Sequence, residues 1–238
     1  MGPNQGGTSL KAIIAMFTLS AVAFGSSSLT LTDISTPGSP LVLTGNVRVI
    51  DEAKSELARF SYAAKVTVKN ESSKVVLLSV IEMRIRGTNG TEVTSTETDD
   101  YFFTSDTLDP GATKLIHDIL RPIYSKNEGE SRALPKARAS VKFVQFLDGT
   151  TWGAPDGDNG SLRERSQTWK TLEALAHTHK TSGEQAFLDE LMAPSELQTV
   201  CYLQRLYLRS KDCKAVLAEV ESMLLNARLH AAGAVNVN

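Results

Sequence analysis

Apolar and polar residues alternate most regularly between Phe60 and Val68, where every second residue is apolar. Lys65, Thr67 and Lys69 occupy the positions between, so an extended chain would have one buried and one wet face. After the polar residues 70–73, a denser apolar run continues to Ile85. This pattern predicts two neighbouring strands joined as a hairpin.

Turn residues divide the flanking sequence into short segments of the same kind. Asn89-Gly90 and Asp148-Gly149 suit hairpin turns, and Asp109-Pro110-Gly111 suits a β-turn. Gly45 is a candidate β-bulge, and the polar stretch 94–98 is a candidate edge strand. Further strands are expected at 29–32, 41–50, 114–120, 139–146 and 150–152. Seven or eight short strands at this spacing predict an all-β, immunoglobulin-like or fibronectin-like sandwich over residues 26–153.

A helical pattern replaces the alternation after a Pro/Gly/Asp linker at 154–160. Ser161-Leu162-Arg163-Glu164 has the spacing of a capping box, and Gly183 interrupts the first helix. We expect a small α-helical unit over residues 161–232 and a frayed tail at 233–238. Such a small unit buries little by itself, so we expect it to dock on the sandwich or on a partner. Trp152 and Trp169 are expected at the boundary between the two.

The first 25 residues have the layout of a signal peptide. Lys11 precedes an apolar run from Ala12 to Phe24, which is shorter than the roughly 20 residues that span a bilayer. Ala23 and Gly25 are small, so cleavage before Ser26 is expected, leaving no membrane span. An uncleaved membrane anchor is the alternative. Cleavage would make the protein periplasmic, displayed at the cell surface or secreted.

Charge and motifs narrow the function classes. The chain has 25 Lys and Arg against 27 Asp and Glu, a balance that gives no reason to expect nucleic-acid binding. It contains no nucleophile elbow, His-Glu-x-x-His or phosphate-binding glycine loop, so no catalytic residue or cofactor is predicted. The acidic run 156–160 fails the EF-hand spacing, and His177 and His179 diverge on a helix. No metal site is predicted.

Export makes Cys201 and Cys213 a candidate disulfide. If a tight turn near Ser210 joins two antiparallel helices, the two residues differ in height by roughly 9 Å, more than a disulfide spans. The bond therefore needs crossed helices or a broken helix. Two buried free thiols are the alternative.

The aromatic residues Tyr101, Phe102 and Phe103 form the cluster best suited to binding a partner protein. Packing in the core is the alternative, because aromatic residues near strand ends are usually buried.

The order of Val66-Thr67-Val68-Lys69-Asn70, an apolar strand and then Leu108-Asp109-Pro110-Gly111 resembles exported bacterial immunoglobulin-like modules of the FxLYD and CARDB kind. The resemblance covers roughly residues 40–150. It implies a fold and an envelope or extracellular location, and it transfers no active site.

These features favour an exported, non-enzymatic interaction or structural module with an unknown protein partner. One alternative is a hydrolase whose catalytic residues are dispersed, for which His117 would need to meet Asp99 or Asp100 and a hydroxyl in one pocket. Another is an envelope assembly or secretion accessory whose edge strand near Thr94 accepts a partner strand.

Overall fold

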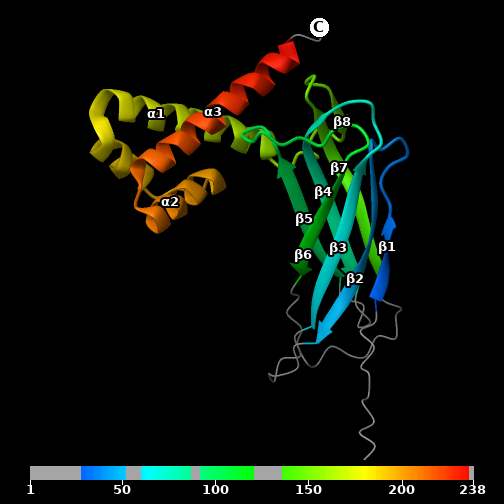
Figure 1. The fold of residues 1–238 in the computed structure, drawn as a ribbon. Coiled ribbons are helices and arrows are strands. Elements are labelled where there is room, and N and C mark those ends of the chain that lie inside the picture. Colours follow the sequence, from blue (N-terminus) through cyan, green and yellow to red (C-terminus); the bar gives the residue numbers. More distant parts are fainter. Residues whose placement is uncertain (1–27, 52–59, 87–91, 121–135, 236–238) are drawn as a thin grey trace, which may run out of the picture.

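The structure, a computed structural model, describes residues 28–51, 60–86, 92–120 and 136–235. It is mainly β, with three helices at its C-terminal end (Figure 1). The strands are β1 (Ser28–Asp33), β2 (Leu41–Asp51), β3 (Phe60–Asn70), β4 (Val76–Arg86), β5 (Glu92–Asp100), β6 (Thr113–Leu120), β7 (Lys136–Phe146) and β8 (Thr151–Gly153). The helices are α1 (Ser161–Leu191), α2 (Gln198–Ser210) and α3 (Cys213–Val235). The predicted signal segment lies outside the described residues.

The strands form one curled sheet in the order β5-β4-β7-β1-β2-β3-β6, with β8 on β7. The curl occurs at β1, whose first half pairs antiparallel with β2 and whose second half pairs parallel with β7. The two halves of the sheet therefore enclose a core, lined on β3 by Tyr62, Ala64, Val66 and Val68. This buried alternation confirms the face predicted for β3. The sheet is a curled half-barrel, so the structure does not confirm the predicted immunoglobulin-like sandwich, which stays a prediction.

The predicted hairpin between β3 and β4 is wrong. β3 pairs with β2 and β6, whereas β4 pairs with β5 and β7 in the other half of the sheet. Periodicity tells which face of a strand is buried but not which strand lies beside it. The expected β4–β5 and β7–β8 pairings are confirmed, and the turn at 109–111 is closed by a hydrogen bond from Ala112 N to Asp109 O of 3.0 Å.

Gly45 is not a bulge, since the β2–β3 register runs unbroken through the pair Gly45 and Val66. A Cβ atom at Gly45 would overlap the backbone carbonyl oxygen of Lys65. Glycine is needed because the two backbones approach closely at this point.

The three helices form a unit with its own core, which includes Leu172, Phe187, Leu203 and Val220. Gly183 interrupts α1 with a φ of 85°, as predicted. The first helix begins at Ser161 as expected, but no capping box forms and Gly160 is the N-cap. Instead, the Leu162 amide donates to Asp158 Oδ2 at 3.2 Å.

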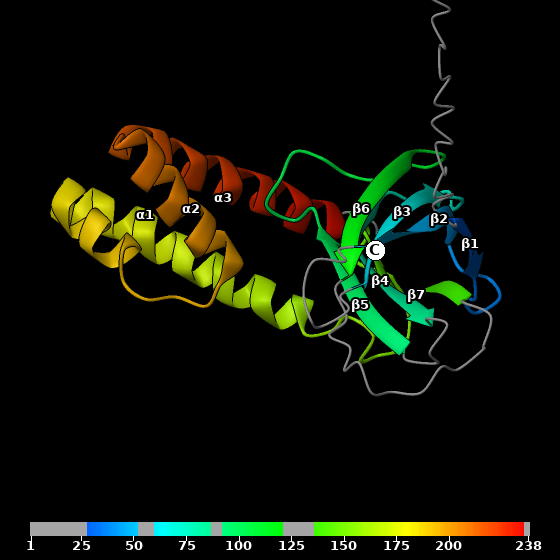
Figure 2. The same cartoon turned by 90° about the horizontal axis from the view of Figure 1, so that it is seen from below.

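The helical unit docks on the sheet and projects from it as an arm (Figures 1 and 2). Leu162 of α1 packs over Leu78, Val80 and Phe143 on the outer face of the sheet. Near the end of α3, Ala227 packs with Phe102. Trp169 lies at this boundary as predicted, whereas Trp152 packs against the core of the sheet. None of the helices in the described ranges combines the length and apolar character needed to cross a membrane.

Candidate functional site

A polar groove of about 550 Å³ lies in the angle between β5 and the helical arm. We call it the β5 groove. Its sheet side is formed by the end of β5 and the segment that follows, and its other side by the first turns of α1 and α2 and by one residue of α3. The lining residues are Thr96, Glu97, Thr98, Asp100, Phe103, Thr104, Asn159, Ser161, Glu164, Arg165, Thr168, Gln198, Thr199 and Met223.

Arg165 links α1 to β5, the two elements that form opposite walls of the groove. Its guanidinium donates from Nε to Asp100 Oδ2 at 2.9 Å and from Nη2 to Asp100 Oδ1 at 2.8 Å. A third bond runs from Nη1 to Gln145 Oε1 at 2.6 Å, and the group lies 4.5 Å from the centroid of the Phe102 ring. Arg165 is 8% exposed, so this bidentate pair is largely withdrawn from water.

β5 is an edge strand, as the polar stretch predicted. It pairs with β4 along one side, and no other described strand pairs with its second side. The curl of the sheet brings β5 within side-chain reach of β6, the other edge. Ser95 Oγ donates to Asp118 Oδ2 at 2.8 Å, and Lys114 forms an ion pair with Asp99. Side chains rather than backbone hydrogen bonds therefore join the two edges.

Glu97 contributes negative charge between the two edges, because it lies on the same face of β5 as Ser95 and Asp99. Burial raises its pKa, and the nearby charges of Asp99 and Asp118 raise it further. The charge of Lys114 lowers the pKa of Glu97, but Lys114 is already paired with Asp99. Glu97 is thus a carboxylate that an added cation would stabilise.

A hollow of about 630 Å³ lies elsewhere, on the outer face of β4, β7 and β8. Its charged groups are already paired, since Glu82 accepts from Arg84 at 2.8 Å and lies 3.1 Å from Lys142. Burial acts to raise the pKa of Glu82, but these hydrogen bonds outweigh it and lower the pKa. The β5 groove is the better candidate because Glu97 has no such cation of its own.

The three candidate partner-binding aromatic residues lie where the helical unit meets the sheet. Phe102 is buried, with its ring centroid 5.3 Å from that of Trp169, whereas Tyr101 and Phe103 are half-buried. His230 Nδ1 lies 3.0 Å from Phe102 O, and Asn226 donates to Phe103 O at 3.4 Å. Phe103 also lines the β5 groove, and a binding role for the exposed part of its side chain stays a prediction.

The residues proposed for a dispersed hydrolase site do not meet in the structure. His117 is exposed and stands across the ladder from Lys65, on the outer face of β6. Asp99 points to the inner face, where it pairs with Lys114, and Asp100 points outward to Arg165. The alternation of β5 separates these two carboxylates.

Neither candidate cysteine is bonded in the structure. Cys213 is buried, and Cys201 is half-buried with its thiol 3.3 Å from Ser195 O. His179 packs edge-on against Phe187, their ring centroids 5.6 Å apart. Within the described part of the chain, no three His, Cys, Asp or Glu side chains are grouped so that they could hold a metal ion.

Sequence reasoning missed Arg165 and Glu97. A usable signal existed for Arg165, because it lies three residues after Leu162 and four before Trp169 and so shares their apolar helical face. A charged residue at such a position indicates a buried partner. No comparable local signal marked Glu97, because its neighbours Asp118 and Lys114 come from β6.

Together these features define a mainly β protein with a helical arm and a polar groove beside an edge strand. No family model and no curated protein matches the sequence. Among solved structures, the chain is similar to one described as "X-ray structure of Northeast Structural Genomics Consortium target SoR45". The two share 9% identity and a TM-score of 0.35, over 49% of this chain and 88% of that chain. A similarity this low carries no argument about function.

Proposed function

We propose that the protein is an exported, non-enzymatic interaction module that binds an extended segment of a partner protein along β5. The observation that carries this proposal is the unpaired side of β5, which lies beside the β5 groove. An edge strand offers a row of backbone donors and acceptors, and an added strand from a partner satisfies them. Export is supported by the pattern of the first 25 residues, and an immunoglobulin-like module would suit this role.

Negative charge beside the free side of β5 favours a partner segment that contains Lys or Arg. Asp100 is neutralised by Arg165, which leaves Glu97 and Glu164 as the carboxylates of the lining without an ion pair among the described residues. A cation beside Glu97 would relieve its repulsion by Asp99 and Asp118. Backbone pairing would supply affinity, and this charge contact would supply selectivity.

Photocrosslinking tests the proposal. A photoreactive amino acid replaces Thr96, an exposed β5 residue in the groove, and the protein is illuminated with an envelope fraction of its source cell. We expect a crosslink to an extended, basic segment of a partner, identified by mass spectrometry. Glu97→Lys should lower the yield by roughly tenfold, because it replaces attraction by repulsion.

Two matched variants control this experiment. Val42 is 41% exposed on β2, away from the groove, and the same photoreactive group there should not capture the segment. Glu190→Lys makes the same charge change at an exposed position of α1 and should leave the yield unchanged. Equal capture from positions 96 and 42, or no response to Glu97→Lys, would count against the proposal.

A further inference from the structure

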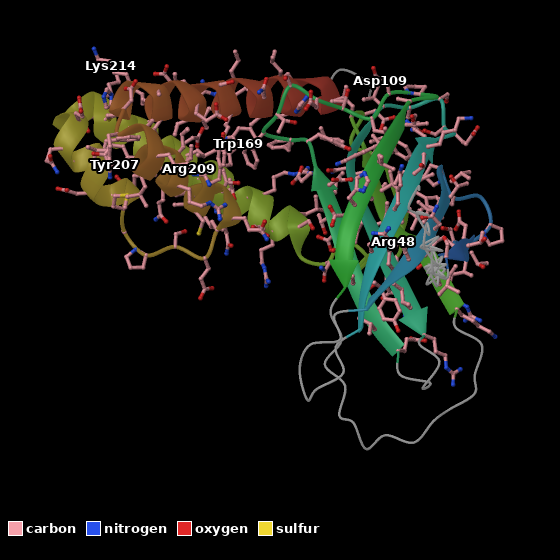
Figure 3. All side chains as sticks on the ribbon, turned by 60° about the horizontal axis from the view of Figure 1, so that its bottom comes forward. Arg48, Asp109, Trp169, Tyr207, Arg209 and Lys214 are labelled. Atoms are coloured by element: carbon pink, nitrogen blue, oxygen red, sulfur yellow. The ribbon has the colours of Figure 1, made fainter. Side chains whose placement is uncertain are left out.

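The outer face of α3 carries an apolar stripe that no described element covers. Leu225 is 57% exposed and Leu229 is 60% exposed, the highest values among the large exposed apolar residues of the described chain. The face of α3 that packs into the helical unit is a different one, formed by Val216, Val220 and Leu224. Figure 3 shows α3 along the outside of the arm, with α1 and α2 on its other side.

The stripe has the spacing of a helix-pairing seam. It consists of Ala215, Ala218, Ser222, Leu225 and Leu229, which follow one another at alternate intervals of three and four residues, and all five are exposed. This spacing keeps one line of side chains facing a second helix over several turns. The seam is about 20 Å long at 1.5 Å per residue.

Charged residues line one side of the stripe at intervals of seven. They are Lys214, Glu221 and Arg228, and all three are exposed. Neither Glu221 nor Arg228 forms an ion pair with another described residue of the chain. Charges in this position face the same flank of a second helix that runs antiparallel.

We propose that α3 pairs antiparallel with α3 of a second copy of this chain. The twofold axis crosses the exposed stripe at the level of residues 223 and 224 along the helix. In this register Leu225 of one copy packs against Ser222 of the other, and Leu229 packs against Ala218. A large side chain meets a small one in each of these layers, so the helices can approach closely. The twofold axis repeats every contact, as an isologous interface requires.

The same register brings opposite charges together. Glu221 of each copy faces Arg228 of the other. The register that packs the apolar stripe therefore also forms two ion pairs. A parallel pairing would place Leu225 against Leu225 and would not bring Glu221 beside Arg228. The charge pattern is therefore self-complementary only in the antiparallel arrangement, which argues for a second copy as the occupant.

Sedimentation equilibrium of the full-length chain tests this inference. Because the seam is short compared with standard interfaces, we expect a dissociation constant in the micromolar range, on the order of 1–100 µM. Glu221→Arg and Arg228→Glu should each raise it at least roughly tenfold, because like charges then meet twice. The double variant Glu221→Arg with Arg228→Glu should restore it to within about threefold, since the pairs reform with reversed polarity.

An apolar pair of variants gives an independent readout. Leu225→Glu should abolish association, whereas Leu208→Glu, at a 50% exposed position on α2, should leave it unchanged. Circular dichroism checks that each variant keeps its helices. A wild-type chain that stays monomeric, single variants that associate like the wild type, or a double variant as weak as the single ones would each overturn the proposal. If the chains associated through the first 25 residues instead, the single variants would associate like the wild type.

Discussion

Arg165 of α1 and Asp100 of β5 form a bidentate ion pair, with nitrogen to oxygen distances of 2.8 and 2.9 Å. It joins the helical arm to the edge strand and so helps to hold the angle in which the β5 groove lies. Arg165 also spans two elements of the sheet, because its third donor reaches Gln145 of β7. Arg165 therefore supports the geometry of the candidate site together with the apolar packing of Leu162 and Ala227.

Arg165→Ala should lower the free energy of unfolding by about 2–3 kcal/mol, because Asp100 then keeps a partly buried charge with no cation. Asp100→Ala should cost a similar amount for the same reason. The double variant should cost much less than the sum, with a coupling energy on the order of 2 kcal/mol in a double-mutant cycle. Chemical denaturation followed by tryptophan fluorescence measures these values, with Trp169 reporting on the boundary.

Arg163→Ala is the matched control, because Arg163 is exposed on the same turn of α1. Its effect should stay within about 0.5 kcal/mol, as for most surface substitutions. Additive single effects of Arg165→Ala and Asp100→Ala would contradict a direct coupling between the two groups.

Local pattern predicted the buried face of β3 and the edge position of β5, but it misled on strand pairing. In β4 the residues from Val76 to Ile81 are all buried, because the core covers one face and Leu162 of α1 covers part of the other. This continuous apolar run concealed that its neighbour is β7, about 60 residues later in the chain. The β5 groove could not be predicted either, because its walls come from β5, α1, α2 and α3.

Gly45→Ala should destabilise the protein by about 2–3 kcal/mol, because the added methyl group overlaps the carbonyl oxygen of Lys65 and pushes β2 away from β3. Gly233→Ala is the control. Its Cβ would lie 3.5 Å from the Leu147 side chain, an ordinary contact, and alanine favours the helix. Thermal unfolding should therefore show a clear decrease for the first variant and no decrease for the second. Equal melting temperatures would be incompatible with the close approach at Gly45.

Lys74 stabilises the β7–β8 turn through Asp148, with 2.7 Å between Nζ and Oδ2. The hydrogen bond from Lys74, followed by that from Thr150, lowers the pKa of Asp148 from 3.8 to about 2. A carboxylate with a lowered folded-state pKa stabilises the fold above its unfolded pKa, and this contribution disappears as the pH falls through the folded value. Lys74→Met should therefore cost about 1 kcal/mol at pH 7 and only a small part of that at pH 2, where about half of the folded-state Asp148 carboxyls are protonated.

Urea denaturation of the wild type and Lys74→Met at several pH values between 2 and 7 tests this. Methionine retains an apolar chain near the Phe146 ring, so the comparison reports mainly on the charge. Lys69→Met serves as the control, since Lys69 and its partner Glu71 are 46% and 48% exposed. Its effect should stay below about 0.5 kcal/mol. A difference for Lys74→Met that persists undiminished at pH 2 would rule out this linkage.

The two cysteines should differ in reactivity as free thiols. Burial raises the pKa of Cys213, and the charges of Glu184 and Asp212 raise it further, so little thiolate forms near neutral pH. Cys201 is half-buried and more accessible. With an aromatic disulfide reagent, Cys213→Ser protein, which retains Cys201, should react at least roughly tenfold faster than Cys201→Ser protein. The difference should vanish in denaturant, where both thiols are exposed; a native wild type with no reactive thiol and a mass lower by two hydrogens would show instead that the bond forms.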